Sequence, residues 1–436
     1  MNPKLAVELT LLVEKKGKNN LMSLLPSVFK NRNYKLYYMG QCVSLIGLWM
    51  QRVAVNWLVY GLTGSSFMLG LVDFTMQIPI LLFSGFSGAV MEGRDIRKLM
   101  IFCQSFSMLH ALTLAILALT GIIRYEYILI LALLIGISDS FELPARQSMI
   151  PALIDDPRDL GSGIALISML FNVTRLIGPS IAGLVIAVTS EGVCFLLNTF
   201  SYIPTLAALL MIKLVRPPSR PISSQGVFNN FREGINYVRS FLPIRNSLLG
   251  MALISFFAFP YLTLTTVFAR DILGGKPYTL GFLMGATGCG ALIGALRLSL
   301  QKTPVGLMKQ MGMAGVAFGF FLILFALSKN LFTSLLIICC VGFCSATTII
   351  SCSTINQTLV DEDKRSRVMS LHVMATIGAT PLGSLCAGGI ASLIGAPITL
   401  AGFGSIALLV GLWWLKISPK MMELARPVYE IKGYNK

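Results

Sequence analysis

Charged residues are scarce in this sequence, because Asp, Glu, Lys and Arg make up only 12% of its 436 residues, whereas a soluble domain carries about 25%. Hydrophobic residues make up 55%, and the mean hydropathy is +0.76. A soluble protein must cover its surface with polar side chains, which this composition cannot supply. The composition therefore indicates an all-α integral membrane protein that is surrounded by lipid.

Histidine is rarer still, with two residues in the chain, and none of the nine cysteines belongs to a C-x-x-C pair. These counts argue against a metal or redox site, and we interpret the cysteines as small apolar packing residues. The sequence also lacks a G-x-x-x-x-G-K-[ST] phosphate loop, a nucleophile elbow and a zincin helix. We therefore expect no enzymatic reaction, no ATP hydrolysis, no metal and no other cofactor.

Apolar stretches of about 20 residues, the length that crosses a bilayer as a helix, occur twelve times in the sequence. The residues before the first stretch are polar and do not resemble a cleavable signal peptide, so we expect the first helix to remain as an anchor. The twelve expected helices cover residues 37–60, 69–91, 99–120, 126–147, 161–188, 193–214, 246–269, 279–300, 307–328, 331–353, 367–394 and 397–415.

The formal net charge of +16 does not indicate nucleic-acid binding. The basic residues lie in short gaps between apolar stretches, which is the pattern that sets membrane topology. If the N-terminus is cytoplasmic, 29 of the 35 Lys and Arg residues lie on the cytoplasmic side, four on the other side and two within helices. The positive-inside rule therefore predicts that both termini are cytoplasmic.

A proline-rich segment, Arg-Pro-Pro-Ser-Arg-Pro at 216–221, separates the first six expected helices from the last six. No helix tolerates this segment, and a surface helix is expected after it, near 227–241. The expected segments are a cytoplasmic tail at 1–36, an N-terminal half at 37–214, a cytoplasmic linker at 215–245, a C-terminal half at 246–415 and a cytoplasmic tail at 416–436.

The two halves repeat each other in sequence. Three short segments of the first half recur about 200 residues later, which are 69–70 with 280–281, 153–156 with 359–362, and 178–183 with 380–383. Paired six-helix halves with a binding site between them, near the middle of the bilayer, are typical of secondary transporters.

Charges within expected helices are costly and therefore require an explanation. Arg52 in the first helix and Asp73 in the second are expected at similar heights, so they form either a structural ion pair or a contact with substrate or protons. Gln41, Gln51 and Gln77 on the same two helices line a polar cavity if they face inward, or else hold helices together by hydrogen bonds.

A second charged group lies on the fourth and fifth helices. Asp139, Glu142 and Arg146 have spacings of three and four, which place them on one helix face as a gate network or as a cluster at the membrane interface. Arg175, near Asn172, requires either a carboxylate, for which Asp139 and Glu142 are the candidates, or helix carbonyls. The candidates for proton coupling are Asp73, Asp139, Glu142 and His110, although a lone histidine is commonly a packing residue.

The loop after the second helix resembles a motif of the major facilitator superfamily, G-x-x-x-D-R-x-G-R-[RK]. Gly88 begins the matching segment, Glu92 stands at the acidic position, and Arg97 and Lys98 supply the basic end. The resemblance covers about residues 30–415 and implies a cytoplasmic gate at these four residues. It also implies that Gly178, Pro179 and Gly183 form the fifth-helix motif of exporters in the superfamily.

Further segments are similar to the branch that contains the enterobactin exporter and related drug/proton antiporters. These segments are Ser44–Gly47, Trp49–Arg52, Trp57–Tyr60, Leu62–Ser65, Glu142–Gln147 and Arg365–Leu371. The resemblance implies proton-coupled export of a siderophore or amphiphilic compound across a bacterial inner membrane. An importer or symporter on the same fold and a non-transporting membrane sensor or assembly partner are the alternatives. We expect a monomer with a small-molecule substrate, with room for cooperation with an outer-membrane efflux channel.

Overall fold

The computed structural model describes residues 27–91, 95–212, 227–301, 303–362 and 364–434. Among these residues, twelve helical segments are long and apolar enough to cross a membrane, as the sequence predicts. The N-terminal half contains α2 (Arg32–Thr63), α3 (Ser66–Met91), α4 (Ile96–Leu119), α5 (Tyr125–Ala152), α6 (Leu160–Val188) and α7 (Glu191–Met211), with the short helices η1 (Ser27–Lys30) and η2 (Pro157–Asp159). The C-terminal half contains α9 (Leu242–Phe257), α10 (Tyr261–Val267), η3 (Phe268–Ile272), α11 (Pro277–Ser299), α12 (Leu307–Leu327), α13 (Leu331–Leu359), α14 (Arg365–Val373), η4 (Met374–Gly378), α15 (Ala379–Ile394) and α16 (Ala396–Ile431).

The seventh and eleventh spans are not single regular helices. The seventh is interrupted at Pro260, because proline has no N–H to donate and its ring collides with the carbonyl four residues earlier. It resumes as α10 and ends in the π-helix η3, while the π-helix η4 lies between α14 and α15. The last span also differs from the expectation, since α16 continues to Ile431 instead of ending near residue 415. In the linker, α8 (Val227–Ser240) occupies the position of the expected surface helix, and residues 213–226 lie outside the described ranges.

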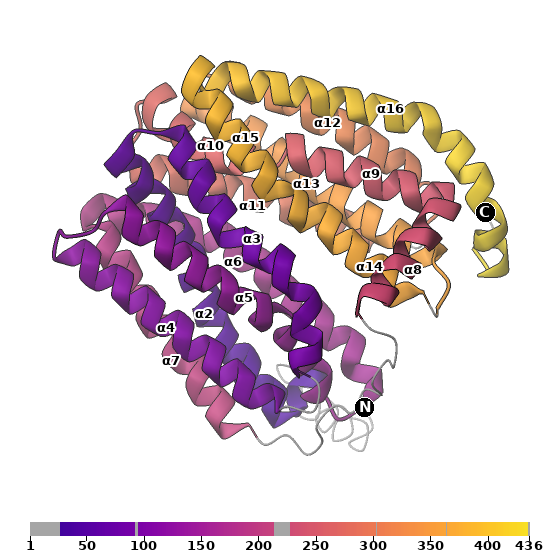
Figure 1. Cartoon of the computed structure of the whole chain (residues 1–436), viewed down its shortest axis with the longest axis horizontal. Helices are drawn as coiled ribbons and strands as arrows, with labels where there is room; N and C mark the ends of the chain where they lie inside the picture. Colours follow the sequence, from indigo (N-terminus) through magenta and orange to yellow (C-terminus); the bar gives the residue numbers. More distant parts are fainter. Residues whose placement is uncertain (1–26, 92–94, 213–226, 302, 363, 435–436) are drawn as a thin grey trace, which may run out of the picture.

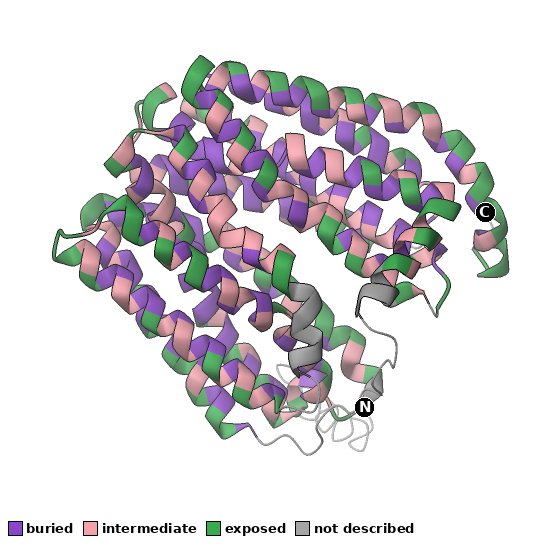
Figure 2. Cartoon of the chain, in the orientation of Figure 1, coloured by how far each residue is buried: buried purple, intermediate pink, exposed green. Residues whose placement is uncertain are grey.

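Exposed apolar side chains form matching stripes on α4 and α12. The stripes consist of residues seven positions apart, Phe102, Leu109 and Ile116 on α4, and Met313, Phe320 and Leu327 on α12. Each residue on α12 lies 211 positions after its counterpart on α4, which is the same offset that relates Gly281 to Gly70. Buried residues gather instead on the faces that the helices turn toward one another (Figure 2). Water would not tolerate such stripes, so these two helices face lipid in both repeats.

The two halves touch at one end of the molecule and diverge toward the other (Figure 1). We call the end with Ser27, α8 and Ile431 the tail end, and the opposite end, where α2 meets α3, the far end. The extensive contacts between the halves join α6 to α11 and α3 to α15. These contacts involve the far parts of the helices, for example where the Ser66 hydroxyl donates to the Gly388 carbonyl at 3.1 Å. The halves therefore join at the far end, and their helices diverge toward the tail end (Figure 1).

At the tail end, the repeated acidic segments hold the chain that enters each half. Asp155, which follows α5, accepts a hydrogen bond from the Asn31 side chain just before α2. Its counterpart Asp361, which follows α13, accepts from the Tyr237 hydroxyl of α8 at 3.0 Å. The sequence repeat thus marks equivalent tethers in the two halves.

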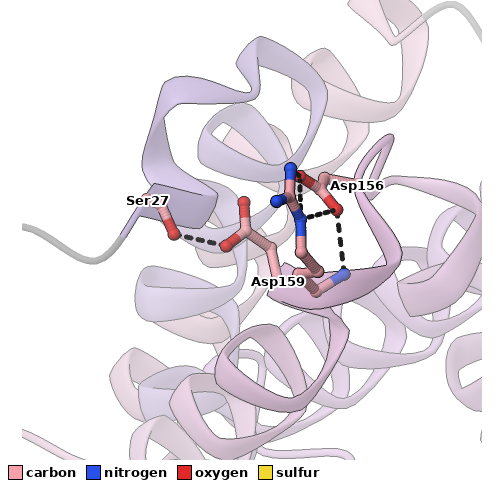
Figure 3. Close-up of polar contacts among 4 residues, drawn as sticks. Ser27, Asp156 and Asp159 are labelled. Atoms are coloured by element: carbon pink, nitrogen blue, oxygen red, sulfur yellow. Dashed lines mark hydrogen bonds and ion pairs between the residues drawn. The ribbon is translucent and has the colours of Figure 1, made fainter.

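A second tether strengthens the one in the N-terminal half (Figure 3). The Ser27 hydroxyl donates to the Asp159 carboxylate across 132 residues of chain. Beside it, the Arg158 guanidinium donates hydrogen bonds to the Asp156 carboxylate, with Nη2 2.8 Å from Oδ2. The hydrogen bonds from Arg158 lower the pKa of the exposed Asp156 carboxyl, because they favour its ionised form.

Candidate functional site

Four charged side chains lie deep within the helices of the N-terminal half. Arg52 is 11 residues from the far end of α2, and Arg175 is 13 residues from the far end of α6. At about 1.5 Å per residue, both lie near the middle of a hydrocarbon core about 30 Å thick. Asp73 on α3 and Asp139 on α5 lie within electrostatic range of Arg52. Since one charge at this depth costs at least ~2.5–3.5 kcal/mol on insertion scales, the group requires an aqueous path or polar partners.

Asp73 bridges the two halves through hydrogen bonds and does not form the expected ion pair with Arg52. Its Oδ1 accepts from the Gln77 side chain one turn away at 2.7 Å. Its Oδ2 lies 3.4 Å from the Thr263 hydroxyl on α10, which also reaches the Ser384 hydroxyl on α15 at 3.1 Å. Gln77 therefore holds the carboxylate from within the N-terminal half, and Thr263 contacts it from the C-terminal half.

Arg52 and Arg175 share one aromatic ring, that of Trp49. The Arg52 guanidinium lies 5.2 Å from the ring centroid and the Arg175 guanidinium lies 5.7 Å from it. Within the described part of the chain, neither arginine has a carboxylate within 4 Å, so the expected pairing of Arg175 with Asp139 or Glu142 does not occur. Phe171 packs edge-on against the same indole at 5.5 Å. Trp49 therefore positions two cations without neutralising them.

The cluster on α5 forms in part. Arg146 pairs with Glu142 one turn away, and Glu142 also accepts from the Gln104 side chain of α4 at 2.9 Å. The Glu142 carboxylate is thus satisfied and buried. Asp139 has no hydrogen bond or ion pair with any described residue, although Glu142, Arg52 and Arg146 all lie within electrostatic range. Glu142 and Arg146 form a structural pair in this conformation, whereas Asp139 remains available.

The remaining polar candidates lie mainly inside the N-terminal half. Gln51 accepts from the Asn198 side chain at 2.7 Å and lies 3.4 Å from Nδ1 of His110, which joins α2, α4 and α7. Gln41 is also buried, and its amide nitrogen has no partner among the described residues. Asn172 donates to the Ser168 carbonyl of its own helix at 2.8 Å. This placement of Gln51 and His110 matches the packing alternative.

The fifth-helix motif lies where α6 approaches both α2 and α11 closely. A Cβ at Gly178 would lie 2.6 Å from the Trp49 Cβ, so this glycine lets α6 approach α2. The Pro179 carbonyl and Gly183 face Gly281 of α11, where an added Cβ would lie 2.5 Å from that carbonyl oxygen. The motif therefore provides backbone-to-backbone contact both within the half and between the halves.

A far-end contact escaped the sequence reasoning. The Tyr60 hydroxyl of α2 donates to the Asp271 carboxylate of η3, and the Arg270 guanidinium lies 5.5 Å from the Trp57 ring and 5.9 Å from the Tyr60 ring. In the sequence, the adjacent charges Arg270 and Asp271 at the end of an apolar helix could have indicated a polar contact. The spacing of residues along the chain does not show that their partner is Tyr60 on α2. This contact joins the two halves across the far end.

The expected gate motif is described only in part. Gly88 belongs to α3 but its surroundings are not described, and Glu92 lies outside the described residues. Arg97 donates to the carbonyls of Leu209 and Leu210 at 2.6 and 2.8 Å, at the end of α7, whereas Lys98 is exposed. Arg97 thus caps a neighbouring helix of its own half. No group of three His, Cys, Asp or Glu side chains in the described ranges is placed to hold a metal ion.

Comparison with known proteins identifies a family model and related transporters that match most of the chain. The model of the transmembrane secretion effector family matches residues 25–426. The staphyloferrin A transporter of Staphylococcus aureus is 26% identical over 388 residues, covering 89% of this chain and 96% of that protein. The multidrug efflux pump Tap of Mycolicibacterium fortuitum is 23% identical, covering 85% and 92%.

Solved structures of transporters share the fold. A peptide transporter, POT, superposes with a TM-score of 0.70 at 13% identity, covering 90% of this chain and 95% of that one. The nucleoside transporter NupG superposes with a TM-score of 0.65 at 14% identity, covering 90% and 99%. At these identities the similarity concerns the fold alone.

Proposed function

The chain belongs to the transmembrane secretion effector family of the major facilitator superfamily, and we propose that it is a proton-coupled exporter of a siderophore or another amphiphilic small molecule. Membership of the family makes it a multi-pass secondary transporter and not an enzyme. The direction, the coupling ion and the substrate class are the proposal. Relatives named as an efflux pump and as a staphyloferrin A transporter support it.

The orientation follows from charge. Because the tail-end segments hold most of the Lys and Arg residues, we place the tail end in the cytoplasm of a bacterial inner membrane. The halves then join on the outer side and diverge toward the cytoplasm, which is the arrangement that we expect to load an exported substrate. Separation of α6 from α11 and of α3 from α15 would open the outer side.

The observation that carries the proton coupling is the position of Asp73 between the halves. Its contact with Thr263 exists only while α3 and α10 are together, so opening of the far end changes the donors around the carboxylate. An acid whose donors differ between two conformations binds a proton with different affinity in each, which is the requirement for coupling. Glu142 keeps its partners on α4 and α5 whichever end is open, so it is the weaker candidate.

Export is tested first in cells. Deletion of the gene is expected to raise the intracellular level of the substrate and lower its level in the supernatant, measured by mass spectrometry of both fractions. A lowered intracellular level with substrate left outside would identify an importer, and no change in any compound would support a sensor or assembly role.

Coupling is tested in everted vesicles with the compound so identified. An imposed pH gradient is expected to drive its uptake, and Asp73→Asn is expected to abolish the dependence on the gradient. Glu126→Gln, which alters an exposed acid at the start of α5, is the matched control. Loss of coupling in Asp139→Asn with normal coupling in Asp73→Asn would overturn the assignment to Asp73.

A further inference from the structure

We propose that Arg52 and Arg175, which both lie beside the Trp49 ring, are the binding groups for a substrate that carries two or more carboxylates. The proposal rests on the proposed transport function and names the chemical class of its substrate. Its starting point is that the structure keeps two guanidinium groups within 5.2 and 5.7 Å of one ring centroid.

The two arginines lack the carboxylate partners that Arg146 and Arg367 have. Arg146 has Glu142, and Arg367 has Glu233 at 2.7 Å. For Arg52 and Arg175, no described carboxylate lies within ion-pair distance. Both guanidinium groups lie beside the indole, and Arg175 also interacts with the Tyr261 side chain. Arg52 lies within electrostatic range of Asp73 and Asp139. Two like charges beside one ring repel each other, so an anion that binds between or beside them lowers their electrostatic energy.

The geometry of the guanidinium group selects carboxylates. Its planar N–H donors match the two oxygens of a carboxylate and bind them in a bidentate manner. Two such groups beside one ring can each take one carboxylate of the same molecule. Trp49 and Phe171, packed edge to face at 5.5 Å, supply an apolar wall for the remainder of that molecule.

The proposed site lies in the N-terminal half and borders the C-terminal half. Arg52 is exposed and Arg175 is half-buried, so both guanidinium groups are accessible to an anion. Arg175 also lies within electrostatic range of Tyr261 on α10, and its own carbonyl lies against Gly288 of α11. A ligand bound to Arg175 therefore lies at the seam that must open for release.

The test is anion binding by the full-length protein in detergent, measured by isothermal titration calorimetry without any gradient. Propane-1,2,3-tricarboxylate is the probe, and its uncharged trimethyl ester is the matched compound. We expect the triester to bind at least tenfold more weakly than the tricarboxylate. Arg52→Gln and Arg175→Gln should each weaken tricarboxylate binding about tenfold or more, and Arg52→Lys should retain part of it. Arg297→Gln, at the tail end of α11, should bind as the unmodified protein does.

Substitution of Asp139 should change the affinity for the tricarboxylate in the opposite direction. Since its charge opposes an anion near Arg52, Asp139→Asn should tighten binding several-fold, which loss of folding cannot imitate. Equal binding of the tricarboxylate and the triester, or unchanged binding in both glutamine variants, would overturn the proposal. Asp73→Asn should still bind the tricarboxylate, so a failure of proton coupling and a failure of this site give different results.

Discussion

Gly281 of α11 lies directly against Gly183 of α6, so that a Cβ added at Gly281 would lie 3.1 Å from the Gly183 Cα and 2.5 Å from the Pro179 carbonyl oxygen. Neither contact can be relieved by moving the end of a flexible side chain, because both partners are backbone atoms. The two halves are thus held together at the far end by an approach that only glycine permits.

Replacement of Gly281 by Ala is therefore expected to loosen the far end without unfolding either half. Hydrogen–deuterium exchange should rise several-fold in peptides from the far parts of α6 and α11, while the interiors of α12 and α13 stay protected. Gly402→Ala on α16, where an added Cβ meets no other atom within 4 Å, is the matched control. Unchanged exchange, or a uniform rise in both halves, would contradict the role assigned to this contact.

Tyr60 and Asp271 form the polar part of the same closure. Tyr60→Phe removes the hydroxyl that bonds to Asp271 and leaves the ring beside Arg270, so it should shift the population toward the far-end-open state. A lost hydrogen bond to a charged group corresponds to about 1.5–3 kcal/mol, or at least a tenfold change in that equilibrium. Distances between spin labels placed across the far end measure this change. Tyr278→Phe is the control, since the Tyr278 hydroxyl has no hydrogen bond to a described residue, and an equal response of the two variants would argue against the contact.

The sequence predicted the membrane fold well because lipid imposes a simple requirement, a long apolar helix with its own hydrogen bonds satisfied. Twelve spans, and the positions of Arg52 and Asp73 within them, followed from that requirement. The partners of Asp73 and Arg175 in other helices did not follow, because they depend on which helices are adjacent across 100 residues or more of chain. Thr263 and Trp49 carry no charge, so nothing in their local sequence marks them as partners of Asp73 and Arg175.

Glu142 and Arg146 should depend on each other for stability. Glu142→Gln leaves a largely buried guanidinium without its counter-ion, and we expect a loss of about 3 kcal/mol, with a smaller loss when Arg146→Met accompanies Glu142→Leu. Thermal unfolding of the detergent-solubilised variants gives both values. Arg426 and Glu430 offer a control of the same spacing on exposed α16, where Arg426→Gln should change stability by less than about 1 kcal/mol. A double variant as unstable as the single one would show that Gln104, rather than Arg146, is the critical partner of Glu142.

Arg97 and Lys98 are adjacent basic residues that the structure places in different surroundings. Arg97 donates to the last carbonyls of α7, while Lys98 is exposed, although both belong to the expected gate motif. Arg97→Ala should therefore fray the end of α7 and lower its local opening free energy by about 1 kcal/mol, which is about a fivefold faster exchange of nearby amides. Lys98→Ala keeps the cap and should leave that exchange unchanged. If both variants instead slow transport equally while exchange in α7 stays the same, the pair acts through its charge at the membrane surface and not through the cap.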